Sequence, residues 1–330
     1  MLTFTSELSD ELIKQGLDLK DTRDWKIKIA RKKTKEIEWK EYIRPYSYRP
    51  FDNRYICYLP SLIDRDRWDM MKNFFEENLG LVLRRSAENT PDWRQIFVGE
   101  HVMDINFLTA QTYIFPLYLY QTKDNPKKRS SGSIMMLFEP EADYLAKKPN
   151  ISPAIVEQLT KDFRKTSSPE QIFFYIYAVL YSSTYRTKYA EFLKIDFPRI
   201  PFTKDYNLFI KMAEYGKRLV DLHLLKSTEI APPVAKFQGK GDNKIEKVKY
   251  ENGRLYINQN QYFEGITNDI WEYQIGGYQV CDKWLKDRKG RRLSLDDIKH
   301  YCRIVTALQN TIKIQKALDN IYMKIESTSV

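Results

Sequence analysis

Glycine, cysteine and histidine are scarce in this sequence. Twelve glycines among 330 residues leave no glycine-rich loop that follows a strand and cradles a dinucleotide or a phosphate chain. The three cysteines, Cys57, Cys281 and Cys302, lie far apart without a CxxC pair, and the three histidines do not cluster. These spacings argue against a zinc site or a disulfide framework and favour buried free thiols.

Motifs of catalysis and of membrane insertion are also missing. There is no Walker-type lysine loop, no GxSxG elbow, and no double proline headed by Asp or Asn, which an amino-methyltransferase needs to hold its target amine. The acidic residues between 64 and 69 alternate with two arginines, which indicates an ion-paired helix start. No apolar run approaches the roughly 20 residues of a membrane span, and residues 1–10 do not resemble a signal peptide. We expect a cytoplasmic protein without its own catalytic residues, metal or cofactor.

What the chain has in excess is positive charge and aromatic residues. Lys and Arg number 54 against 44 Asp and Glu, which gives a net charge of +10 and a pI of about 9.2. Such a surface attracts polyanions, of which nucleic acid is the commonest. The 23 Tyr, 17 Phe and 6 Trp indicate a folded chain, and its length favours two subdomains over one.

The hydrophobic pattern predicts an α+β fold in four segments. Residues 1–40 form a linker or connecting helix, and 41–150 a first α/β part with strands near 54–59, 79–84, 95–98 and 113–120. Residues 151–233 form a helical subdomain, and 234–330 a hairpin region followed by C-terminal helices.

Three local signals are specific within this outline. Ser168-Pro169-Glu170-Gln171 predicts a capped helix start, and Asn252-Gly253 predicts a tight hairpin turn. Ser294 precedes a three-four apolar stripe that predicts a last helix reaching about 45–50 Å if unbroken. That length suits a spacer or docking helix as well as a core element.

Basic residues at predicted strand ends and turns are the candidates for DNA contact. The arginines near 84–94 could hydrogen-bond to base edges. The lysines before the hairpin and the dense basic cluster at 283–292 could contact phosphates. The same residues also suit ordinary surface ion pairs. They are Arg84, Arg85, Arg94, Lys240, Lys244, Lys283, Lys286, Arg288, Lys289, Arg291 and Arg292. A further basic cluster, 127–129, lies in a polar loop at 122–132 that suits solvent or phosphate equally.

Several longer blocks resemble one known family. Residues 48–55 read Tyr-Arg-Pro-Phe-Asp-Asn-Arg-Tyr, and 115–120 read Phe-Pro-Leu-Tyr-Leu-Tyr. The aromatic run 173–186, its continuation 189–201, and the Ile-Gly-Gly-Tyr block at 275–288 follow in the same order. Together they are similar to the C-terminal specificity region of bacterial type ISP restriction–modification enzymes over most of residues 45–325.

The resemblance implies a target-recognition module for double-stranded DNA. In that family a nuclease, a translocating ATPase and an N6-adenine methyltransferase precede the module, so S-adenosylmethionine, ATP and Mg²⁺ are expected only there. This chain begins just before the Tyr-Arg-Pro-Phe-Asp block, so we expect a fragment, a truncated gene or a separate subunit.

The blocks themselves are interpreted as framework, and residues 84–112 and 236–265 between them as the parts that approach base edges. Two alternatives remain open: a scaffold that docks on a methyltransferase, and a freestanding nuclease or transferase with dispersed catalytic residues.

Overall fold

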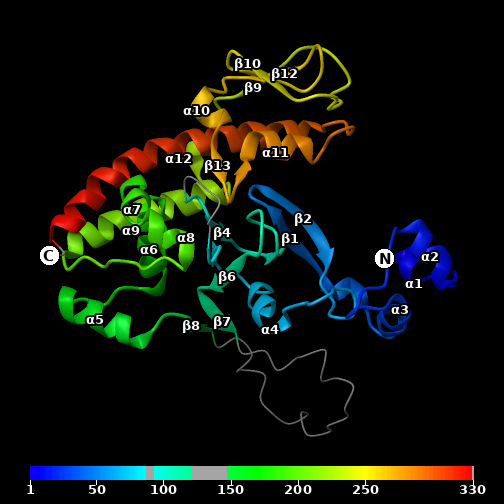
Figure 1. Cartoon of the computed structure of the whole chain (residues 1–330), viewed down its shortest axis with the longest axis horizontal. Helices are drawn as coiled ribbons and strands as arrows, with labels where there is room; N and C mark the ends of the chain where they lie inside the picture. The colour runs from blue at the N-terminus through cyan, green and yellow to red at the C-terminus, as the bar shows by residue number, and fades with distance from the viewer. Residues whose placement is uncertain (87–92, 121–146, 329–330) are drawn as a thin grey trace, which may run out of the picture.

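A computed structural model describes residues 1–86, 93–120 and 147–328 of the chain. The fold is α+β, with several small sheets and a group of helices that includes one long C-terminal helix (Figure 1). The predicted basic loop at 122–132 lies outside the described residues. The small sheets and the helices confirm the predicted α+β fold class. The four segment boundaries stay predictions.

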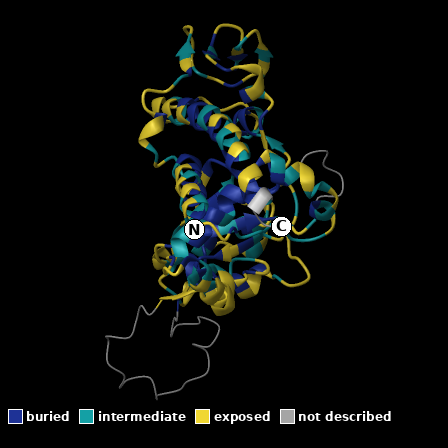
Figure 2. Cartoon of the chain, turned by 90° about the vertical axis from the view of Figure 1, so that its left-hand side faces the viewer, coloured by how far each residue is buried: buried dark blue, intermediate teal, exposed yellow. Residues whose placement is uncertain are grey.

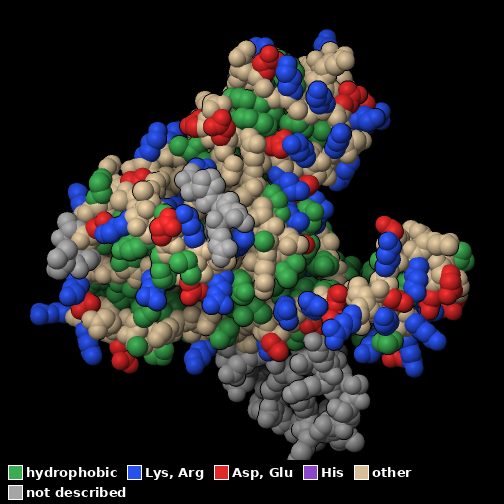
Figure 3. Space-filling model, in the orientation of Figure 1, with side chains coloured by type: hydrophobic (Ala, Val, Ile, Leu, Met, Phe, Trp, Pro, Cys, Tyr) green, Lys and Arg blue, Asp and Glu red, His purple; other side chains and the backbone are tan. Residues whose placement is uncertain are grey.

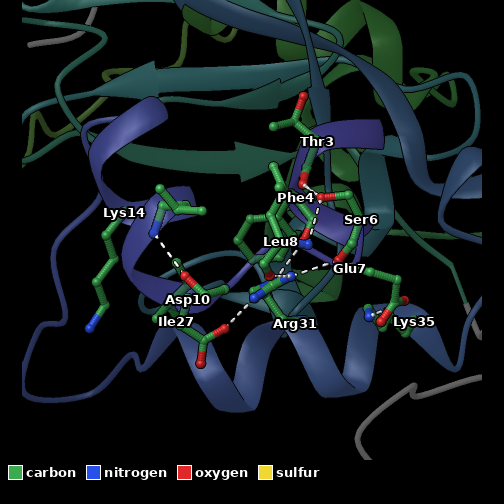
Figure 4. A network of polar contacts seen from close by, with 12 residues as sticks. Thr3, Phe4, Ser6, Glu7, Leu8, Asp10, Lys14, Ile27, Arg31 and Lys35 are labelled. Atoms are coloured by element: carbon green, nitrogen blue, oxygen red, sulfur yellow. Dashed lines mark hydrogen bonds and ion pairs between the residues drawn. The ribbon is translucent and has the colours of Figure 1, made fainter.

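The N-terminal segment forms three short helices with a small core of their own. The helices are α1 (Leu2–Thr5), α2 (Asp10–Gly16) and α3 (Ile27–Lys35). Arg31 of α3 is nearly buried, and its guanidinium donates to three backbone carbonyls and pairs with one carboxylate (Figure 4). These partners are Phe4, Ser6, Leu8 and Asp10. One buried side chain thus fixes the loop between α1 and α2 onto α3.

Short strands dominate the next part of the chain. They are β1 (Ile43–Arg49), β2 (Asp52–Cys57), β3 (Gly80–Leu83), β4 (Ile96–Gly99), β5 (Val102–Met103), β6 (Tyr113–Pro116), β7 (Tyr118–Tyr120) and β8 (Lys147–Pro149). They form three sheets in the orders β2-β1-β5, β4-β3-β6 and β7-β8. A helical turn, α4 (Trp68–Met71) continued by a 3-10 turn (Lys72–Phe74), follows the alternating acidic residues and arginines that indicated a helix start.

The run 113–120 was predicted as one strand, and this was wrong. It divides at Leu117 into β6 and β7, which belong to different sheets. Pro116 has no N–H to continue the ladder, and the amide of Leu117 instead donates to the carbonyl of Leu79 at 2.7 Å.

The helical part of the chain comes next. It contains α5 (Pro153–Phe163), α6 (Pro169–Tyr181), α7 (Ser183–Lys188), α8 (Ala190–Ile195) and α9 (Tyr206–His223). Ser168 caps α6 in a full capping box with Gln171, as its sequence indicated. Gly216 lets α9 approach α6 closely, because a Cβ there would overlap the carbonyl oxygen of Phe174.

The last part is a small sheet on top of two helices. The sheet has the order β10-β11-β12-β9, from β9 (Lys236–Gln238), β10 (Lys249–Glu251), β11 (Arg254–Tyr256) and β12 (Tyr262–Glu264). After α10 (Asn268–Trp271), strands β13 (Gln274–Ile275) and β14 (Tyr278–Gln279) lead into α11 (Val280–Lys286) and α12 (Leu295–Thr328). Asn252 and Gly253 have φ of 48° and 77° in the predicted hairpin turn between β10 and β11.

Helix α12 is a core element and not a free spacer or docking helix. It extends unbroken over 34 residues, about 50 Å at 1.5 Å per residue. Tyr301, Val305, Leu308, Leu318 and Tyr322 along it are completely buried. It packs against α9, α7 and α6, and Figure 2 shows buried residues gathered in this middle layer.

One continuous apolar core extends from the small sheets through these helices to the β9–β12 lobe, and the N-terminal core is separate from it. The β9–β12 lobe and the N-terminal helices stand away from the main body. Between them the surface is hollowed (Figure 3).

Candidate nucleic-acid interface

Two basic segments far apart in the sequence lie side by side at the edge of this hollow. They are the loop 239–248, between β9 and β10, and the turn 287–293, between α11 and α12. Their backbones bond at three points: Ile245 N to the Arg291 carbonyl at 2.9 Å, Gly290 N to the Ile245 carbonyl at 2.8 Å, and Leu293 N to the Asn243 carbonyl at 2.9 Å. The loop and the turn are therefore one structural unit.

Residues with positive φ make this pairing possible. Gly239, Asn243 and Gly290 have φ of 94°, 59° and 79°, which turn the chain sharply on both sides of the contact. Leu293 and Ile245 are buried beneath it. The apolar side chains thus anchor the unit, and the basic ones are left outside.

Six of the predicted DNA-binding residues are exposed on this unit and on the adjoining end of α11. We call this set the basic junction: Lys240, Lys244, Lys286, Lys289, Arg291 and Arg292. In Figure 3, Lys and Arg side chains gather on the side of the upper lobe that faces the hollow.

Only two cations of the junction are neutralised by ion pairs among the described residues. Arg292 pairs with Asp242 at 3.1 Å and Lys286 with Asp282 at 2.7 Å. The other four residues of the junction have no carboxylate within ion-pair distance in this part of the chain. Exposed Lys and Arg side chains of this kind can neutralise DNA phosphates.

Lys283 and Arg288, predicted with this group, have internal partners instead. Arg288 is only 12% exposed and forms a bidentate pair with Asp52 at 2.8 and 3.2 Å, while its guanidinium lies 3.7 Å from the centre of the Trp284 ring. Lys283 pairs with Asp287, the C-cap residue of α11. Arg288 thus links α11 to the turn after β1, and its contact with phosphate stays a prediction.

Asp52 is the acidic centre of that link. It is 2% exposed and also accepts from Arg54 at 2.9 Å. Burial by itself would raise the pKa of Asp52, but the hydrogen bonds from Arg288 and Arg54 outweigh burial and lower it. Its carboxylate is therefore charged at neutral pH.

The arginines near β3 and β4 lie apart from the basic junction. The Arg84 side chain is 3.4 Å from the Thr109 hydroxyl, and the Arg94 carbonyl accepts from Gly276 N at 2.8 Å. Arg85 is exposed and pairs with Asp196 at 3.1 Å, the surface ion pair that was the alternative interpretation. Arg84 and Arg94 lie beside the β13–β14 turn, through Thr109 and Gly276. The predicted set thus divides into two groups, and the DNA contacts of both groups stay predictions.

The cysteines and the histidine of the core are buried, and burial shifts their pKa values. Burial raises the pKa of the Cys281 thiol to about 12 and that of Cys302 to about 11, while Cys57 is half-buried. Burial lowers the pKa of His223 to about 3, and its ring bonds Tyr177 at 2.7 Å and Thr311 at 3.0 Å.

The described residues contain no group of three or more His, Cys, Asp or Glu side chains placed to hold a metal ion. None of the helices among them has both the length and the apolar character of a membrane span.

One structural feature of the candidate site was not found from the sequence. It is the pairing of the loop 239–248 with the turn 287–293, which no local pattern signals.

Comparison with known proteins gives one family and several solved structures of the same fold. The family model described as "Type ISP C-terminal specificity domain" matches residues 1–317. No curated protein matches the sequence.

Three solved structures share the fold. The ATP-dependent Type ISP restriction-modification enzyme LlaBIII bound to DNA has a TM-score of 0.69 at 19% identity, over 96% of this chain and 21% of that one. A nuclease-deletion mutant of the Type ISP enzyme LlaGI with a DNA substrate mimic has 0.59 at 18%, over 84% and 20%. The DrdV–DNA complex has 0.70 at 21%, over 95% and 32%. This chain thus spans between a fifth and a third of the length of these proteins.

Proposed function

The chain belongs to the family of type ISP C-terminal specificity domains, and from this membership we propose that it recognises a sequence in double-stranded DNA. The three solved proteins that share its fold are DNA complexes by their titles. The observation on this chain that supports the proposal is the basic junction, where four exposed cations, without acidic partners in the part of the chain that the structure describes, border a hollowed face.

In this proposal the junction holds phosphates and base contacts come from elsewhere. Phosphate contacts fix the register of a protein on the duplex but carry no sequence information. We assign base contacts to the segments 84–112 and 236–265. The first contains Arg84 and Arg94 beside the β13–β14 turn, and the second contains the β10–β12 hairpins.

The chemistry of modification and cleavage lies outside this chain in the same proposal. An adenine-N6 methyltransferase, with a nuclease and a translocase, would act at the site that this module selects. S-adenosylmethionine, ATP and Mg²⁺ would be bound by those other parts, which we propose as the partners of the chain besides DNA. The methyltransferase would extrude its target adenine from the duplex.

The test is the salt dependence of duplex binding. Log affinity falls with log salt concentration by about 0.9 per phosphate contact. Fluorescence anisotropy with a labelled duplex should therefore give a steep slope for the wild-type chain. The double variant Lys244→Gln/Lys289→Gln should lower that slope by about 2.

The matched control is Lys161→Gln/Lys204→Gln. Both lysines are exposed, without ion pairs among the described residues. Lys161 is in α5, and Lys204 lies just before α9, whose first turn packs on the end of α5. In Figure 1, α5 lies on the opposite side of the molecule from α11. This variant should keep the wild-type slope. Equal slopes for the two double variants, or no duplex affinity at all, would contradict the proposal. Binding to a methyltransferase domain without DNA affinity would instead support the scaffold alternative.

A further inference from the structure

The loop between β5 and β6 is strained where it packs on the β13–β14 turn. Thr109 in this loop has a φ of 41°, a left-handed conformation that is unfavourable for a β-branched residue. Its hydroxyl donates to the carbonyl of Gly276 in the turn. A Cβ on Gly276 would lie 2.5 Å from the Leu108 side chain, so only glycine leaves room for this packing. Strain of this kind persists where the surrounding structure holds it, and such residues cluster at functional sites.

The loop is also fixed from the inside. Phe107 and Leu108 are 2% and 0% exposed and anchor it in the core. The amide of Leu108 donates to the Thr112 hydroxyl at 3.0 Å, and the amide of Thr112 donates to the Ile105 carbonyl at 2.8 Å. The loop therefore has its shape before any ligand arrives, and binding pays little for ordering it.

Four side chains of this loop are left on the surface. We call this set the recognition tip: Ile105, Asn106, Thr109 and Gln111. Ile105 is 56% exposed, although it is apolar. The side-chain amides of Asn106 and Gln111 have no hydrogen-bond partner in the part of the chain that the structure describes. The tip thus holds an apolar group and two unused amides on a rigid support.

The chemistry of the tip matches base edges and not phosphates. Residues 105–112 contain no charged side chain. Asn and Gln amides pair with N6 and N7 of adenine in the major groove, and apolar side chains contact the methyl group of thymine. One cation, Arg84, lies beside the tip, with its Nη1 3.4 Å from the Thr109 hydroxyl. No described carboxylate pairs with Arg84, so it favours the approach of a polyanion.

Helix α11 joins the tip to the basic junction. The Tyr278 hydroxyl, just before α11, donates to the carbonyl of Asn106 at 3.1 Å, whereas Lys286 of the junction is the last residue of α11. The seven residues of α11 span about 10 Å. The major groove is about 12 Å wide. Phosphate contacts at the junction and base contacts at the tip are therefore separated by about the width of one groove.

We propose that the recognition tip enters the major groove of the target duplex and determines sequence specificity. Asn106 and Gln111 hydrogen-bond to base edges there, and Ile105 contacts the methyl group of a thymine. This inference rests on the proposed DNA-binding function, and it names the side chains that read bases within the segment 84–112.

The test selects bound sequences from a pool of duplexes with about ten random base pairs, one turn of the double helix. The wild-type chain is mixed with the pool, and the retained duplexes are sequenced. Asn106→Ala and Gln111→Ala should each lose the preference at one or two base pairs of the wild-type pattern, with discrimination there falling about tenfold or more. Their affinity for an unselected duplex and their salt slope should equal those of the wild type, because the tip holds no phosphate.

Asn207→Ala provides the matched control. Asn207 is exposed, its side-chain amide also has no partner among the described residues, and it lies in the first turn of α9. This variant should select the same pattern as the wild type. Thermal unfolding verifies that all three variants are folded.

The outcomes separate the two proposals. If the wild-type chain selects a pattern and both tip variants select the same one, the tip is refuted and the proposed function stands. A tip variant that lowers the salt slope as the junction variant does would also refute the tip as a reader of bases. If the wild-type chain binds no duplex, or binds all sequences equally, the proposed function fails and the tip fails with it.

Discussion

Breaking the ion pair between Asp52 and Arg288 should destabilise the whole C-terminal half of the chain. The two residues are 236 positions apart, and they join the β1–β2 turn to α11. Their side chains are 2% and 12% exposed. The variant Arg288→Gln removes one charge and leaves the buried carboxylate of Asp52 with Arg54 as its only cation.

The expected loss in the free energy of unfolding follows from the burial of both side chains. Removing one partner of a buried pair costs about 3–5 kcal/mol, because the other charge stays buried without compensation. Arg54, at 2.9 Å, still neutralises part of Asp52, so the expected loss for Arg288→Gln is at the lower end, about 3 kcal/mol. Asp52→Asn should cost a similar amount by leaving Arg288 unpaired.

Urea unfolding followed by tryptophan fluorescence measures these differences. The double variant should lose less than the sum of the single losses, with a coupling of about 1–3 kcal/mol. Additive losses, or single losses below about 0.5 kcal/mol, the range of ordinary surface changes, would refute this account of the pair.

The same pair predicts a pH dependence. The folded-state pKa of Asp52 is lowered, since the bonds from Arg288 and Arg54 outweigh the effect of burial. The stability that it contributes is complete above its unfolded pKa of about 3.9 and is lost as the pH falls through the folded value. The wild-type chain and Arg288→Gln should therefore converge in stability at acidic pH, and a constant difference would contradict this.

Three further predictions concern the fold. Gly216→Ala should destabilise the chain by several kcal/mol or prevent folding, because the new methyl group would overlap a backbone carbonyl oxygen of α6; the thermal midpoint and the soluble yield measure this. Ser168→Ala should cost about 1 kcal/mol by removing the cap of α6, which urea unfolding would detect. Thiol titration should leave Cys281 and Cys302 unreactive in the native state and expose them with denaturant, because both are buried with raised pKa; half-buried Cys57 should react first.

Local patterns in the sequence predicted individual elements well. The Ser168 capping box, the Asn252-Gly253 turn and the helix after Ser294 were all found where their residues indicated. Each depends on contacts within a few positions, which side-chain chemistry decides almost alone. The strand 113–120 failed because its division depends on the Leu79 carbonyl, which lies far away in the sequence.

The candidate site was predicted only in part, because it also depends on contacts between residues far apart in the sequence. Lys240, Lys244 and the cations at 286–292 were identified as separate groups, and their polar surroundings indicated exposure. The sequence did not indicate that the backbones of Lys244 and Arg292 form an isolated antiparallel β-bridge. It also did not indicate that Arg288 forms an ion pair with Asp52.

The sequence by itself determined the composition of this protein's surface and the identity of its local elements. Net charge, aromatic content and the order of its blocks follow from the chain and need no fold. Only the tertiary structure decided which cations are exposed without an acidic partner among the described residues, and which, such as Arg288, are neutralised inside. The reason is physical: ion pairs and cavities form between segments that packing of the core brings together, and that packing is a property of the whole chain.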